Sequence, residues 1–143
     1  GRLITNSAGG PCEVIYNKPA EGGQTVEDYV SGRGISEMYS SYSGEKLSAK
    51  EISVLARGGN EKAMLCFNRL GAALGTAVNE YVAKYNAEKI ILGGQVSKSG
   101  DLFSDEMQKH ITRKLQISVS VEDNAALLGI FKSFGDINQN RLT

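Results

Sequence analysis

The sequence predicts an α/β fold in which a mixed sheet is packed by helices, and two observations support this class. A short apolar run at residues 90–92, rich in β-branched residues, stops at Gly93 and Gly94, which is typical of a buried strand. Long helical patterns precede and follow this run. A helix, a buried strand, a glycine turn and a second helix place bare backbone at the carboxyl end of a strand, where open α/β sheets bind ligands.

The N-terminal part is rich in turn residues and predicts short strands followed by a broken helix. Residues 12–16 read as a short strand, and residues 2–4 look like a strand fragment. Apolar residues between Val26 and Tyr39 follow a helical period, which is interrupted near residues 32–34, where two glycines flank an arginine.

Two helices are predicted from their first residues. Ser48 and Glu51 form a capping box, which opens a short helix that ends at the glycines 58–59. Asn60 then caps the longest helix, which covers roughly residues 61–85.

Two glycines interrupt the apolar stripe of the longest helix. Gly71 and Gly75 lie on or near this stripe. Glycine in a helix interior is less favourable than alanine by about 1 kcal/mol. Their positions therefore predict close packing of the helix against a strand or another helix.

The chain beyond the glycine turn predicts three more elements. A helix of about 14 residues begins near Leu102, and its apolar period runs to Leu115. Residues 117–121 alternate between apolar and polar side chains and read as a strand. Residues 125–134 read as a final helix that is apolar on most of its circumference, and we expect it to be buried.

The composition is that of an ordinary globular protein. The 143 residues suffice for a single domain, 1–143, and the 16 basic and 16 acidic residues leave no basic surplus that would suggest direct contact with nucleic acid. No apolar stretch approaches the roughly 18 residues that would span a bilayer. The two cysteines, Cys12 and Cys66, have no metal-binding spacing. We therefore expect a soluble protein of the cytoplasm, without contact with a membrane.

The order of several motifs points to a family. Lys-Ile-Ile-Leu-Gly-Gly-Gln-Val-Ser at residues 89–97 is followed by Ala-Ala-Leu-Leu-Gly at residues 125–129. Val-Glu-Asp-Tyr-Val-Ser-Gly at residues 26–32 and Gly-Arg-Leu-Ile at residues 1–4 precede them. Together these motifs resemble the C-terminal lobe of the ROK family, the bacterial sugar kinases and sugar-responsive repressors with an actin-like (ribonuclease H-like) ATPase fold.

The resemblance implies a nucleotide site at the glycine turn. In such kinases the corresponding segment lines the adenine and ribose of ATP, which binds with Mg²⁺. Gly93, Gly94 and Gln95 are the matching residues, and Gln95 stands where the family usually has a third glycine. The alternative is a plain tight turn that leaves a strand.

The resemblance also implies a sugar site, with a hexose or hexose derivative as ligand. Glu13 and Glu27 match glutamates that contact the sugar, and the alternative is that they are ordinary surface carboxylates. Tyr16 stands at the family's histidine position. The family's zinc motif has no counterpart, because residues 17–25 contain no cysteine, and we therefore predict no structural zinc and no metal site.

No catalytic residue is assigned, because the loops that hold the phosphates and the catalytic base in the family have no counterpart in this sequence. The resemblance therefore implies a lobe that is inactive alone and works with an N-terminal lobe of the same or a companion chain. Two alternatives stay open: the sugar-sensing domain of a ROK-type repressor, and a degenerate, non-catalytic dimerisation domain. Family members commonly form homodimers, and we expect the same here.

Four further side-chain types have plain interpretations. Cys66 is expected to be a small buried hydrophobe in the long helix, and Arg33 a solvated loop cation. His110 is expected to be solvated, without a partner and without function. The tyrosines at positions 29, 39, 81 and 85 are spaced like core or interface residues.

Overall fold

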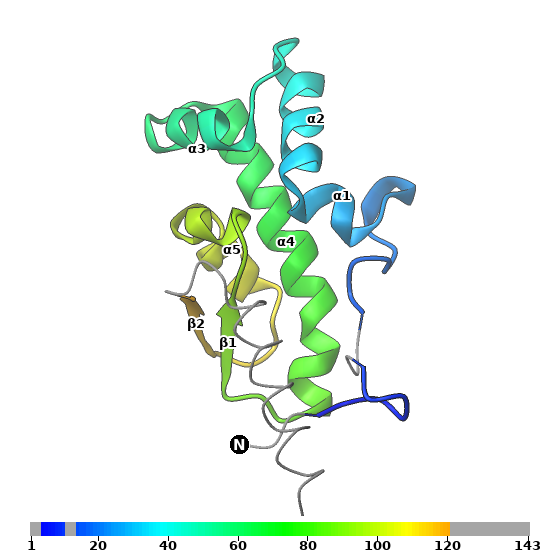
Figure 1. The fold of residues 1–143 in the computed structure, drawn as a ribbon. Helices are drawn as coiled ribbons and strands as arrows, with labels where there is room; N and C mark the ends of the chain where they lie inside the picture. The colour runs from blue at the N-terminus through cyan, green and yellow to red at the C-terminus, as the bar shows by residue number, and fades with distance from the viewer. Residues whose placement is uncertain (1–3, 11–13, 121–143) are drawn as a thin grey trace, which may run out of the picture.

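The computed structural model describes residues 4–10 and 14–120 (Figure 1). The final helix predicted at residues 125–134 lies outside the described residues. So does the strand fragment predicted at residues 2–4, of which only Ile4 is described. In chain order the described elements are η1 (Glu21–Gly23), α1 (Val26–Val30), α2 (Gly32–Ser43), α3 (Ala49–Arg57), α4 (Glu61–Lys84), β1 (Lys89–Leu92), η2 (Val96–Leu102), α5 (Ser104–Lys109) and β2 (Gln116–Val119).

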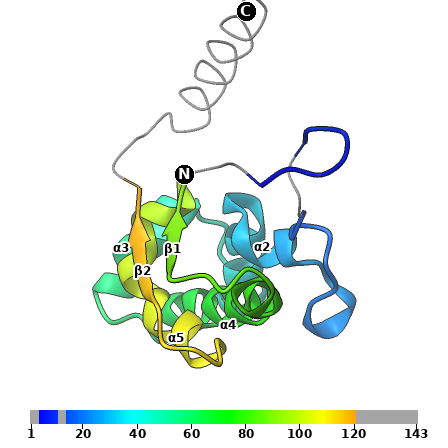
Figure 2. The same ribbon diagram turned by 90° about the horizontal axis from the view of Figure 1, so that it is seen from below.

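The helix α4 is the element around which the others are arranged. It begins at the predicted cap, where the side chain of Asn60 accepts a hydrogen bond of 2.9 Å from the backbone N–H of Ala63. Phe67 and Leu70 of α4 are fully buried in the main core. In both views, α1 and α2 lie on one side of α4, and the two strands lie on the other with α5 (Figures 1 and 2).

The two glycines of α4 allow α5 to approach closely, as the sequence predicts. A Cβ atom on Gly71 would lie 2.7 Å from the carbonyl oxygen of Phe103, and one on Gly75 would overlap the carbonyl oxygen of Met107. Neither backbone oxygen can move without separating the two helices. The lower helix propensity of glycine is therefore offset by the packing of α4 against α5.

The hydrophobic core has two parts, which follow one another along α4. The first joins α2, α3 and the N-terminal half of α4, and the second joins the C-terminal half of α4 to α5 and the strands. Buried members of the first part include Ile35, Tyr39, Ile52, Cys66, Phe67, Leu70 and Phe103, and those of the second are Val82, Met107 and Ile111.

The two described strands pair in parallel, in the register Ile90 with Ile117 and Leu92 with Val119. They confirm the strands predicted at residues 90–92 and 117–121, although Val121 lies outside the described residues. The prediction of a buried strand is wrong for β1, because Ile91 is 66% exposed. Only one face of this pair packs on α4 and α5 in the described part of the chain, and Ile91 points away from that face.

A helix does begin near Leu102, as predicted, but its predicted length of about 14 residues is wrong. The chain forms the 3-10 helix η2 and the six-residue α5 instead, with non-helical backbone at Ser99 and Phe103. After α5 the backbone is held by side-chain amides: the side chain of Asn79 accepts from the N–H of Thr112 at 2.9 Å, and that of Gln108 from the N–H of Leu115 at 3.0 Å. These bonds compete with helix continuation, although the apolar spacing alone would continue it.

The predicted interruption between Val26 and Tyr39 occurs at Ser31, whose backbone is extended. The Ser31 hydroxyl accepts a hydrogen bond of 3.0 Å from the N–H of Gly34, which starts α2. A Cβ atom on Gly34 would overlap the carbonyl oxygen of Asp28. The position therefore requires glycine, because the last turn of α1 packs directly on the first turn of α2.

The strand predicted at residues 12–16 is wrong where it can be compared. Residues 14–15 are irregular, and a turn follows at residues 16–17, closed by a hydrogen bond of 3.1 Å from the N–H of Lys18 to the carbonyl of Ile15. Cys12 and Glu13 lie outside the described residues. The antiparallel bridge nearest to this segment instead joins Pro19 to Thr25. Among the helices described, none is both long and apolar enough to cross a membrane.

Candidate functional site

The glycine turn lies at the carboxyl end of β1, as the sequence predicts. Gly94 has a φ angle of +87°, a left-handed conformation that favours glycine. Its carbonyl accepts a hydrogen bond of 2.7 Å from the Ser97 hydroxyl, and the carbonyl of Leu92 accepts one of 2.8 Å from the N–H of Ser120. The turn is therefore fixed at both ends, by η2 and by the residue that follows β2.

The backbone of this turn is open to a ligand. Gly93, Gly94 and Gln95 are all exposed, and a Cβ atom on either glycine would meet no atom within 4 Å. Gly93 has no positive φ angle, so neither packing nor backbone strain in the described structure requires glycine there. The structure brings the three predicted nucleotide residues together on an accessible surface, and their role in binding stays a prediction.

Arg57 contacts the segment after the turn, and the sequence alone does not indicate this contact. The guanidinium of Arg57, at the end of α3, donates two hydrogen bonds to the Asp101 carboxylate, from Nε to Oδ2 at 2.8 Å and from Nη2 to Oδ1 at 2.7 Å. These bonds hold the pKa of Asp101 below its ordinary value. The two residues are 44 positions apart, and no local pattern connects them.

The predicted sugar residue Glu27 lies beside a hollow of about 360 Å³ that Tyr16 also lines. The backbone joins them, because the N–H of Glu27 donates a hydrogen bond of 3.0 Å to the carbonyl of Tyr16. The structure thus places Glu27 next to the residue that stands at the family's histidine position. Glu13, the second predicted sugar residue, lies outside the described residues.

The first turn of α1, which carries Glu27, is fixed by its own polar residues. The carboxylate of Asp28 accepts hydrogen bonds from the backbone N–H of Thr25 at 2.8 Å and from its hydroxyl at 2.9 Å. These bonds hold the pKa of Asp28 below its ordinary value. Arg33, predicted as a solvated cation, is largely exposed, and its guanidinium lies 3.9 Å from the same carboxylate.

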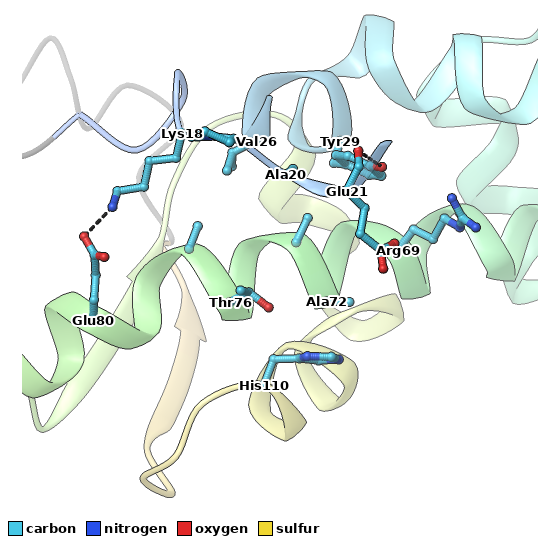
Figure 3. Close-up of a pocket in the computed structure, with 13 residues that line it drawn as sticks. Lys18, Ala20, Glu21, Val26, Tyr29, Arg69, Ala72, Thr76, Glu80 and His110 are labelled. Atoms are coloured by element: carbon cyan, nitrogen blue, oxygen red, sulfur yellow. Dashed lines mark hydrogen bonds and ion pairs between the residues drawn. The ribbon is translucent and has the colours of Figure 1, made fainter. Parts of the chain in front are cut away.

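A larger cavity of about 540 Å³ lies along α4, between the loop before η1 and the end of α5 (Figure 3). Its floor consists of the small side chains of Ala72, Ala73, Thr76 and Ala77. At one end Lys18 forms an ion pair with Glu80, and its ammonium lies 4.8 Å from the centre of the Tyr81 ring. The Arg69 side chain lies at the other end (Figure 3).

His110 is exposed, as predicted, but the prediction that it has no partner is wrong. It borders this cavity, and its Nε2 lies 3.3 Å from the Glu106 carboxylate, so it does have a partner. Glu106 lies on α5 and His110 directly follows this helix, four residues later, a spacing at which side chains meet. The spacing of four residues between Glu106 and His110 is the sequence signal that indicates this pair.

Cys66 is fully buried, as predicted, and burial raises the pKa of its thiol to about 11. A buried thiol with a raised pKa is a poor nucleophile near neutral pH. Of the tyrosines expected in the core or at an interface, Tyr29 and Tyr39 are buried, and Tyr81 and Tyr85 are partly exposed. Within residues 4–10 and 14–120, no three side chains of His, Cys, Asp or Glu gather as a metal site.

Solved structures of other proteins share the fold of this chain. The glucokinase of Parabacteroides distasonis matches with a TM-score of 0.66 and 23% identity, over 73% of this chain and 31% of that chain. A ROK family transcriptional regulator, a homolog of the E. coli MLC protein, matches with a TM-score of 0.59 and 19% identity, over 72% of this chain and 31% of that one. The described structure therefore has a fold found in sugar kinases and in a related regulator.

Sequence comparison defines the family. Residues 20–134 match the model of the ROK family, and the chain belongs to this family. The N-acetyl-D-glucosamine kinase of Photobacterium profundum is 31% identical over 90 residues, which make up 63% of this chain. The match spans 29% of the length of that enzyme. The resemblance of the motifs to the ROK family is confirmed, and the assignment to its C-terminal lobe stays a prediction.

Proposed function

We propose that this chain is the nucleotide- and sugar-binding C-terminal lobe of an ATP-dependent hexose kinase. The observation that carries the proposal is the open glycine turn at Gly93 and Gly94, at the carboxyl end of β1 in a chain of the ROK family. Ligands of open α/β sheets bind at this end of a strand. The relatives named as sugar kinases support the same reading.

The proposed nucleotide contact is with the nucleoside end of ATP. Because no Cβ stands in the way, a flat base and its ribose can lie against the backbone of Gly93 and Gly94. The exposed amide of Gln95 can donate to and accept from the base or ribose. The phosphates and Mg²⁺ are assigned to the N-terminal lobe of the same or a companion chain.

The proposed sugar contact is at Glu27. A carboxylate accepts hydrogen bonds from two neighbouring hydroxyls of a pyranose, which suits a hexose or hexose derivative. Glu13 is the second proposed acceptor. Tyr16 adds a ring and a hydroxyl to the same hollow, where the family has a histidine.

Titration calorimetry of the chain with ATP-Mg²⁺, glucose and N-acetylglucosamine tests the proposal. We expect binding of the nucleotide and of at least one sugar. Glu27→Gln should weaken sugar binding about tenfold or more, since it removes a charge-assisted hydrogen bond. Glu61→Gln is the matched control, because Glu61 is also an exposed glutamate in the first turn of a helix. Equal affinities for the wild type and Glu27→Gln would contradict the assignment of Glu27.

We also propose that the chain does not phosphorylate a sugar alone and acts in the cytoplasm, as a homodimer. A coupled assay with ATP-Mg²⁺ and hexose should read zero, and clear turnover would contradict the need for a second lobe. The alternative favoured by the matched transcriptional regulator is a sugar-sensing domain, which would bind sugar without nucleotide. Binding of neither ligand would leave the third candidate, a non-catalytic dimerisation domain.

A further inference from the structure

The segment that follows the glycine turn is weakly held by its own backbone. It forms the 3-10 helix η2, whose hydrogen bonds are poorer than those of an α-helix, and Ser99 interrupts it with non-helical backbone. Gln95 and Lys98 are exposed. A fixed shape for this segment therefore depends on contacts with other elements.

Arg57 of α3 provides such a contact on both sides of the interruption. Besides its two bonds to Asp101, its Nη2 lies 3.4 Å from the carbonyl of Lys98, to which it donates. Lys98 lies directly before Ser99, and Asp101 lies two residues after Ser99. Nη1 also donates to the buried Ser53 hydroxyl at 3.3 Å, which orients the guanidinium from the side of α3.

The contacts continue from this anchor to the turn. Ser97 is adjacent to Lys98, is buried, and donates its hydroxyl hydrogen to the carbonyl of Gly94 at 2.7 Å. A shift of Lys98 therefore moves the hydroxyl that fixes the left-handed residue of the turn. Val96 at the start of η2 and Phe103 after its end both pack in the core, whereas Lys98 between them is exposed and its carbonyl accepts from Arg57.

We propose that Arg57 is a positioning residue for the nucleotide turn, acting through Asp101 and the Lys98 carbonyl. This inference rests on the proposed nucleotide function of Gly93 and Gly94. The planar fork of arginine can bind a carboxylate with two bonds and reach a neighbouring carbonyl at the same time, which the single ammonium of lysine cannot do. Arg57 holds the shape of the site without touching the ligand.

Two measurements on the 143-residue chain test the proposal. Calorimetry gives the affinity for ATP-Mg²⁺, and hydrogen exchange gives the local opening of the amides at residues 94–102. Arg57→Gln should weaken nucleotide binding about tenfold and speed exchange in this range, with little change in global stability, because the pair is half-exposed. Arg57→Lys should lie between the wild type and Arg57→Gln, since it keeps the charge and loses the fork.

A double-mutant cycle separates positioning from a general structural effect. The double variant of Arg57→Gln with Asp101→Asn should bind ATP no more weakly than Arg57→Gln alone, because each change removes the same contact, the pair of Arg57 with Asp101. Lys109→Gln is the control, because it removes another exposed ion pair, with Glu106 on α5, and should alter neither affinity nor exchange at residues 94–102.

The outcomes distinguish this inference from the proposed function. Wild-type affinity and wild-type exchange in Arg57→Gln would overturn the positioning role, and so would equal losses in Lys109→Gln. If the wild type binds no ATP, the nucleotide function fails. The exchange data then decide on their own whether Arg57 orders the turn, and unchanged exchange would overturn that too.

Discussion

The glycine turn after β1 and the hollow beside α1 are held by different kinds of contact. The segment after the turn is held by a side chain from a distant part of the sequence, Arg57, which bonds Asp101 and the carbonyl of Lys98. The hollow depends on local backbone geometry, namely the bond between Glu27 and Tyr16 and the tight junction of α1 with α2 at Gly34. Single side-chain changes should therefore disturb the turn without unfolding the chain, whereas the hollow should be lost only with its helices.

Gly34→Ala should have the largest effect and would confirm that the hollow is tied to the fold. The added Cβ would overlap the Asp28 carbonyl, so we expect a loss of about 3 kcal/mol in the free energy of unfolding, measured by urea denaturation. Gly32→Ala is the matched control in the same helix, since its Cβ would lie 3.9 Å from that of Ala49, an ordinary contact. Equal stability of the two variants would refute the tight junction.

Gly93→Ala tests the turn with the same chemical change. Its Cβ points into open space and its φ angle is not positive, so stability should be unchanged or raised by about 0.5 kcal/mol. Binding of ATP-Mg²⁺ should weaken about tenfold, because the methyl group occupies the path of the nucleoside. Calorimetry and thermal melting measure the two effects, and an unchanged affinity would argue for a plain turn.

Ser48→Ala tests the helix that carries Arg57. The Ser48 hydroxyl accepts from the N–H of Glu51 at 3.3 Å, and its loss should lower the free energy of unfolding by about 1 kcal/mol. Ser41→Ala is the control, because its hydroxyl only donates to a carbonyl one turn earlier in α2, and it should be nearly neutral. A denaturant series on both variants shows whether the cap of α3 contributes as expected.

The smallest expected effect is the pH dependence of the Arg57–Asp101 pair. The Arg57 bonds lower the pKa of Asp101 in the folded chain below its ordinary value of 3.8. The stabilisation is therefore present above pH 3.8 and is lost as the pH falls through the lower pKa of the folded state. The free energies of unfolding of the wild type and of Asp101→Asn should differ at pH 5 to 7 and converge in acid. A difference that stays constant with pH would rule out this linkage.

The sequence predicts the elements that carry local signals. The capping residues Ser48 and Asn60 mark the starts of α3 and α4, and Gly71 and Gly75 indicate the close packing of α4 that the structure shows against α5. These signals lie within one helix, so no knowledge of distant contacts is needed to read them.

Predictions fail where distant contacts decide. The apolar spacing from Leu102 to Leu115 is helical. However, the side chain of Asn79, 33 residues before Thr112, accepts a hydrogen bond from the N–H of Thr112, which competes with helix continuation. Arg57 reads as an ordinary basic residue at a helix end, and its role becomes visible only with Asp101 in place. The candidate site is thus predictable at its glycines and not in its supporting contacts.

The burial of Cys66 gives the chain an internal reporter of opening. With a pKa of about 11, roughly a thousandth of this thiol is ionised at pH 8, and its sulfur is shielded from reagents. In a Cys12→Ser background, the rate of thiol labelling would therefore follow the separation of α4 from α2 and α3. Retardation of labelling by a bound ligand would then give the free energy that the ligand contributes to holding these helices together.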